Sequence, residues 1–205
     1  MKLDELNNLH LDGIKEAANI GSGHAASALS QMIGKNIMVN VPEVKIMKLE
    51  DVPYIFGEEP PVVAAILTNF FGDFTGRNLL IFSEEKSRIL LDLLFGKPIG
   101  TTVEFGEMEV SSIKELANIV SSSYLSAISE FLGLMVLPSV PAFVLDNLAS
   151  VLTTVYTDFT AEKELAICVE TSFYFAEQDI ELEGILLMIP DPVGLDKILK
   201  SMGLI

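Results

Sequence analysis

Cysteine, histidine and basic side chains are scarce in this chain of 205 residues, and tryptophan is absent. The single cysteine, Cys168, excludes an intrachain disulfide, and its apolar, strand-like neighbours favour a buried structural thiol over a nucleophile. Thirteen Lys and Arg against 29 Asp and Glu give a net charge of −16, which argues against a nucleic-acid or anionic-membrane partner. The polar, acidic N-terminus is not a signal peptide, and no apolar run is long enough to span a membrane. We therefore expect a cytoplasmic protein with no nucleic-acid and no membrane partner.

What the chain does contain is an internal duplication. Residues 12–34 align without a gap to residues 111–133, at an offset of 99 residues, and 11 of the 23 positions are identical. Pro42 and Pro141 fall at the same offset. Two related halves are therefore expected.

Each copy of the repeated stretch predicts an amphipathic helix. At about 100° per residue, the apolar side chains of each copy gather on one side of the helix. A second stripe lies almost opposite and holds, in the two copies, Asp12, Glu16, Asn19 and Gly23, and Ser111, Glu115, Asn118 and Ser122. An exposed Glu and Asn on one helix are ordinary, and copies of one ancestor can share residues that simply have not diverged. The core positions do vary between the copies, however, whereas the Glu and the Asn, a poor helix former, do not.

The remaining segments predict alternating strands and helices in both halves. Strands are expected over 37–48, with Pro42 at an edge or bulge, and over 62–70, 77–82, 165–176 and 183–189. Besides the repeated helices, over 11–33 and 107–132, further helices are expected over 84–96, with Ser83 as N-cap, over 141–152, with Pro141 in the first turn, and over 192–202. Residues 50–61 and 97–106 are expected to be a loop and a linker.

This order predicts an α/β fold, a two-layer α/β sandwich with an internal pseudo-twofold duplication. Its antiparallel sheet would carry the two long motif helices on one outer layer. We expect residues 1–205 to form one domain built of two repeats, about 11–96 and 110–203.

Other catalytic constellations find no support in the sequence. His10 and His24 are the only histidines, and Ser123 replaces His24 in the second copy, which argues against a shared catalytic histidine. Asp12 and Glu16 have a spacing that could hold a metal ion, but no His joins them and Ser111 replaces Asp12 in the second copy. We expect no cofactor and no metal ion belonging to the protein itself.

The pattern Asp/Ser-x3-Glu-x2-Asn-x22-Pro, present twice, resembles the CheC phosphatases, in the CheC/CheX/FliY group of bacterial and archaeal chemotaxis. The resemblance implies hydrolysis of the aspartyl phosphate of a phosphorylated CheY-type response regulator. It implies that Asn19 and Asn118 position water, and that Glu16 and Glu115 hold a lysine of the receiver. The Mg²⁺ ion would belong to the receiver, and the protein would be a monomer with CheD as a regulatory partner.

The alternative is a non-catalytic adaptor that binds CheD or phosphorylated CheY. The sequence favours the enzyme because both Glu–Asn pairs are intact. The binding reading rests on the end of the expected 141–152 helix, around Asp146 and Asn147, which by family similarity is where a CheD-like partner would bind.

Overall fold

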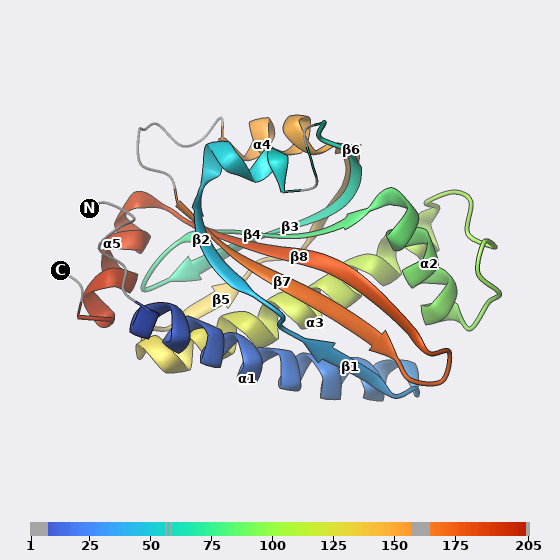
Figure 1. The fold of residues 1–205 in the computed structure, drawn as a ribbon, viewed down its shortest axis with the longest axis horizontal. Helices are drawn as coiled ribbons and strands as arrows, with labels where there is room; N and C mark the ends of the chain where they lie inside the picture. The colour runs from blue at the N-terminus through green and yellow to red at the C-terminus, as the bar shows by residue number, and fades with distance from the viewer. Residues whose placement is uncertain (1–7, 56, 58, 157–164, 204–205) are drawn as a thin grey trace.

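An eight-stranded antiparallel sheet forms the centre of the structure, a computed structural model that describes residues 8–55, 57, 59–156 and 165–203 (Figure 1). In chain order the elements are α1 (Asn8–Ile33), β1 (Ile37–Asn40), β2 (Val44–Lys48), the 3₁₀ helix η2 (Leu49–Tyr54), β3 (Val62–Gly72), β4 (Gly76–Ser83), α2 (Glu84–Phe95), α3 (Glu107–Leu132), β5 (Val136–Pro138), β6 (Ala142–Asn147), α4 (Leu148–Tyr156), β7 (Leu165–Phe175), β8 (Ile180–Pro190) and α5 (Pro192–Ser201). None of the helices in these ranges has the length and apolar character needed to cross a membrane.

The strand order is the same when read from either end of the sheet. The path is β1-β7-β8-β4-β3-β5, with β2 also paired to β7 and β6 also paired to β3. Exchanging every strand for its counterpart in the other repeat reverses this path, so the pseudo-twofold axis passes between β4 and β8. The short strands of each repeat pair with a long strand of the other repeat. The predicted antiparallel sheet with pseudo-twofold symmetry is confirmed.

A bulge interrupts the short strands next to the repeated proline in both repeats, and in the second repeat it begins one residue earlier. Asn40 pairs with Ser172 and Val44 with Val169, so three residues around Pro42 oppose two residues of β7. Pro138 pairs with Phe70 and Ala142 with Leu67, so residues 139–141 likewise oppose two residues of β3. A proline cannot donate to the strand ladder, and a bulge accommodates it. The expected bulge at Pro42 is confirmed.

Helices α1 and α3 lie side by side across one face of the sheet (Figure 1). Their apolar stripes are buried, Ile14, Ala18 and Leu29 in α1 and Ile113, Ala117 and Ile128 in α3. The two helices end at Gly34 and Gly133, whose φ angles of 71° and 64° are the left-handed cap that glycine adopts without steric cost. Buried residues of α2 and α5 belong to the same core.

The predicted helix over 141–152 is wrong. Residues 142–147 are strand β6, paired with β3 from Leu67 to Val62, and the helix, α4, begins only at Leu148. The backbone of this β-favouring Phe-Val-Leu segment is satisfied by pairing with β3. Asn147, rather than Pro141, starts the helix, since its Oδ1 accepts a hydrogen bond of 2.9 Å from the Ala149 N–H.

Helix α4 and η2 cover the opposite face of the sheet from α1 and α3 (Figure 1). Val52 and Leu152 pack there against Leu79 and Leu187. The sequence predicts a loop over residues 50–61, but residues 49–54 form the 3₁₀ helix η2. This second, smaller helical layer therefore adds to the two predicted layers.

Candidate functional site

The motif residues of α1 form an exposed stripe. Asp12, Glu16 and Asn19 are all solvent-exposed, one helical turn apart, whereas the neighbouring Ala17 and Ala18 are buried. Gly21 shows which side of α1 faces α3, because a Cβ there would lie 2.9 Å from the Tyr124 Cα. At 100° per residue, the three motif residues lie roughly 140–180° around the helix from Gly21. The first motif face is therefore turned away from α3.

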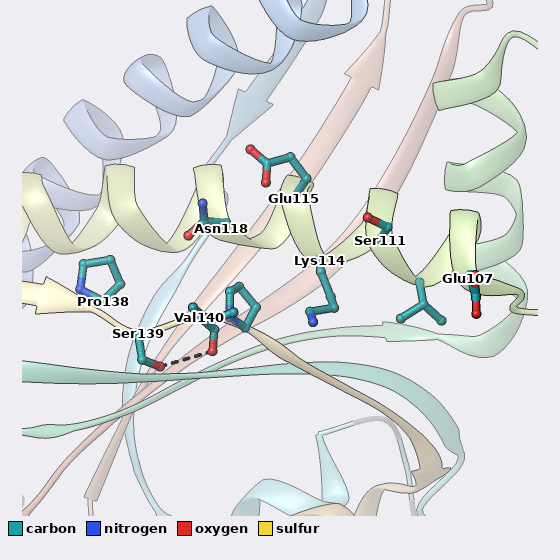
Figure 2. A pocket seen from close by; sticks show the side chains of 10 residues that line it. Glu107, Ser111, Lys114, Glu115, Asn118, Pro138, Ser139 and Val140 are labelled. Carbon is teal, nitrogen blue, oxygen red and sulfur yellow. Dashed lines mark hydrogen bonds between the residues drawn. The ribbon is translucent and has the colours of Figure 1, made fainter.

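The second motif face, on α3, lines a pocket of about 580 Å³. Figure 2 shows Ser111, Glu115 and Asn118 projecting from successive turns of α3, with Lys114 extending from the same helix toward the side on which Val140 lies. The opposite wall is the bulge, Pro138 to Pro141. Glu115 and Ser111 are exposed and Asn118 is half-buried. The pocket thus brings together the complete second copy of the motif, Ser111, Glu115, Asn118 and Pro141.

The motif side chains are free to bind something else. Within the described ranges, the side-chain amides of Asn19 and Asn118 make no hydrogen bond to the protein, and Glu16 and Glu115 form no ion pair. Ser22 donates a hydrogen bond of 2.8 Å to the backbone oxygen of Asn19, which leaves the amide itself untouched. An amide can donate and accept at once, and a carboxylate accepts from a cation. These four groups can therefore hold a water molecule and a basic side chain.

The two faces point to opposite flanks of the helix pair. On α3, the motif residues lie roughly 120–180° around the helix from Tyr124, the residue that meets Gly21 of α1. On each helix, the motif face is thus turned away from the other helix of the pair. Two macromolecules could approach the two sites from opposite directions without overlapping.

The sequence did not identify the wall that faces the motif on α3. Val110 and Lys114, with Pro138, Ser139 and Val140, line the pocket but were not singled out. The number of residues between Asn118 and Pro141, which is the same as that between Asn19 and Pro42, was the sequence feature that could have linked the bulge to the motif. Pro141 is buried in the pocket wall, in keeping with a structural role.

Groups that could do other chemistry are placed elsewhere. Cys168 is 1 % exposed, as expected, and burial raises the pKa of its thiol to about 12. His24 is exposed on α1, while the side chain of His10 lies outside the described residues. Among the residues described, no three His, Cys, Asp or Glu side chains form a group that could hold a metal ion.

Fold and site together define a protein with paired surface Glu–Asn motifs on two symmetry-related helices over one antiparallel sheet. The CheC-like family model matches residues 9–46 and 108–145, the two segments that carry the motifs. Over 195 residues the chain is 31 % identical to the CheY-P phosphatase CheC of Bacillus subtilis, covering 94 % of this chain and 93 % of the relative. The chain belongs to the CheC-like family.

More distant relatives share parts of the sequence or the fold. The flagellar motor switch phosphatase FliY of Bacillus subtilis is 28 % identical over 129 residues, which are 62 % of this chain and 33 % of that protein. The crystal structure of Thermotoga maritima FliY superposes with a TM-score of 0.76 at 22 % identity, covering 97 % of this chain and 96 % of the other. At that identity the likeness establishes the fold.

Proposed function

We propose that this chain is a chemotaxis phosphatase that hydrolyses the aspartyl phosphate of a phosphorylated CheY-type receiver. The observation that carries the proposal is the repeated Glu–Asn pair, in which Glu16, Asn19 and Glu115 are exposed, Asn118 is half-buried, and none has a side-chain partner among the described residues. The name of the Bacillus subtilis relative, a CheY-P phosphatase, supports the same activity. We expect the protein to act as a monomer in the cytoplasm.

In the proposed reaction, Asn19 or Asn118 positions the attacking water. An aspartyl phosphate is an acyl phosphate, so its carboxylate is already a good leaving group and needs little activation. Water adds to phosphorus in line with the breaking bond, and the products are inorganic phosphate and the receiver's free aspartate. The amide oxygen accepts a hydrogen bond from the water and the N–H₂ orients it, but the amide does not remove a proton. The Mg²⁺ ion enters with the receiver.

Glu16 and Glu115 hold the receiver in this proposal. Each carboxylate lies one helical turn before its Asn, on the same exposed face, and is free to accept a lysine ammonium group from the receiver. Drawing that lysine away from the phosphoryl group would open a path for the water. Glu16→Gln and Glu115→Gln should therefore raise the KM for the phosphorylated receiver.

A CheD-like protein is the proposed regulatory partner, and we propose that it binds this chain at the surface around Asp146. Asp146 is exposed near the end of β6, whereas Asn147 is engaged, with its Nδ2 donating to the Pro60 oxygen at 2.6 Å. Asp146→Lys should abolish co-elution with the partner. Glu181→Lys, which makes the same charge change at an exposed site in β8, is the control. Unaltered co-elution of the Asp146→Lys protein would dismiss this surface.

Turnover separates the phosphatase from the adaptor. A phosphorylated receiver is mixed with one-hundredth of its amount of this protein, and the remaining acyl phosphate is followed with time. A catalyst accelerates the decay of the whole receiver population, whereas an adaptor can affect only the small fraction that it binds. Decay at the receiver's own rate would reject the enzyme and favour the adaptor.

A further inference from the structure

The two motif sites have different walls. At the α3 site, Val140 is 84 % exposed and lines the pocket with Glu115 and Asn118. Its counterpart in the first repeat, Val41, is 7 % exposed and belongs to the core. The prolines that follow are reversed, since Pro141 is buried and Pro42 is exposed. Near-identical motifs therefore stand beside an exposed apolar side chain in one repeat and a buried one in the other.

Ser139 holds the α3 wall in this conformation. Its backbone N–H donates to the Asn69 oxygen at 2.7 Å, and its Oγ accepts from the Asn69 N–H at 3.0 Å. These two bonds fix Ser139, the residue before Val140, to β3. Pro141, the residue after Val140, is buried. The Val140 side chain is thus presented outward from a fixed piece of backbone and loses little conformational freedom when it is covered.

A receiver bound at this site must cover Val140. The same pocket is lined by Glu115 and Asn118 from α3 and by Val140 from the bulge, so a domain that reaches the first two also meets the third. Val110 and Pro138 are apolar neighbours in that pocket. Covering an exposed apolar side chain is favourable, and the α1 site has no corresponding gain from Val41.

We propose that Val140 is a docking residue for the phosphorylated receiver and makes the α3 site bind it more tightly than the α1 site. The inference rests on the proposed phosphatase function. It assigns to Val140 affinity rather than chemistry, so its removal changes KM and leaves kcat essentially unaltered.

Single-site backgrounds test this directly. In Asn19→Ala protein, where only the α3 site retains its Asn, Val140→Asp should raise the KM for the phosphorylated receiver about tenfold, and Val140→Ala should raise it less. In Asn118→Ala protein, where only the α1 site retains its Asn, Val140→Asp should leave KM unchanged. Tyr54→Asp, which removes another exposed apolar side chain from the opposite face of the sheet, is the control. An unchanged KM for Val140→Asp in the Asn19→Ala background overturns the proposal.

A binding measurement separates failure of this inference from failure of the phosphatase assignment. The Asn19→Ala/Asn118→Ala protein is titrated with a receiver carrying beryllofluoride, a stable mimic of the acyl phosphate. Two classes of site are expected, and adding Val140→Asp should weaken only the tighter class. Two sites of equal affinity that are unaffected by Val140→Asp would contradict the role of Val140, even if the wild-type protein turns over the phosphorylated receiver. Absence of turnover by the wild-type protein, together with the two expected classes of site in the double variant, would instead reject the phosphatase and keep Val140 as a docking residue.

Discussion

Gly21 of α1 lies against the backbone of Tyr124 in α3. A Cβ on Gly21 would be 2.9 Å from the Tyr124 Cα and 3.2 Å from the Ser123 carbonyl oxygen. The atoms that it would meet are backbone atoms of a packed helix, which cannot move aside cheaply. This contact sets the spacing of the two helices and, with it, the separation of the two motif faces.

Gly21→Ala should destabilise the protein, by about 1–3 kcal/mol, because overpacking outweighs the better helix propensity of alanine. Gly23→Ala is the matched control two residues away, where nothing lies within 4 Å of a Cβ. That control should gain up to about 1 kcal/mol from helix propensity alone. Urea unfolding of both variants measures the difference. Equal effects of the two substitutions would show that the helices are not in close contact at Gly21.

Asp92 ties the linker between the repeats to α2. Its buried carboxylate accepts hydrogen bonds from the N–H groups of Gly100, Thr101 and Thr102, at 2.7, 3.1 and 2.8 Å, and from the Thr102 hydroxyl at 2.6 Å. Burial alone would raise the pKa of Asp92, but these four bonds hold it below its ordinary value of 3.8. Asp92→Asn should cost about 3 kcal/mol at neutral pH, because an amide N–H₂ would face backbone donors.

The pH dependence of the stability lost in the Asp92→Asn variant is a sharper test. Since the folded state holds the carboxyl at a lower pKa than the unfolded chain, the stabilisation is complete above pH 3.8 and disappears as pH falls through the folded pKa. The gap in unfolding free energy between wild type and Asp92→Asn should therefore narrow below that pH. Asp51→Asn, at an exposed position of η2, serves as the control for a surface carboxylate. A gap that stays constant to low pH would contradict the ionised, hydrogen-bonded carboxylate.

The proposed single domain of two repeats predicts that neither half folds alone as a monomer. Among the described residues, β1 and β2 pair with β7 of the other half, and β5 and β6 pair with β3 of the other half. A separated half would therefore leave its own short strands without a partner and one edge of its long strand, β3 or β7, uncovered. Residues 1–100 and 101–205, expressed separately, should give poorly dispersed amide spectra, and mixing them should restore dispersion. A half that is monomeric and fully folded on its own would contradict this domain organisation.

Much of the fold followed from the sequence, because periodicity and end signals agreed with the tertiary structure. Ser83 caps α2 as expected, with its side chain accepting from the Lys86 N–H, and both motif helices end at the predicted residues, Ile33 and Leu132. The helix prediction for residues 142–147 was wrong because a proline followed by an apolar run also fits the start of a helix. The internal duplication could have corrected this prediction. Residues 142–147 align with residues 43–48, which the sequence predicts to be a strand and which are mostly β2.

The motif residues of the candidate site were found from the sequence, but the wall that faces them was not. Glu115 and Asn118 repeat at a fixed spacing, which a single sequence reveals. Val140 does not differ from Val41 as a residue type, and only the backbone of the bulge decides that one is exposed and the other buried. That choice depends on Ser139 binding the backbone of Asn69, a contact across 70 residues that no local pattern encodes.

The most direct test of the central claim is the rate of acyl-phosphate loss from a phosphorylated CheY-type receiver, measured with wild type, Asn19→Ala, Asn118→Ala and the double variant. At saturating receiver, each single variant should keep about half of the activity, because the two faces lie on opposite flanks and act independently. Loss of both positioned waters should lower the rate on the order of 10²-fold, while the double variant still binds the receiver. A double variant as active as wild type would contradict the account, since the amides would then not position the water.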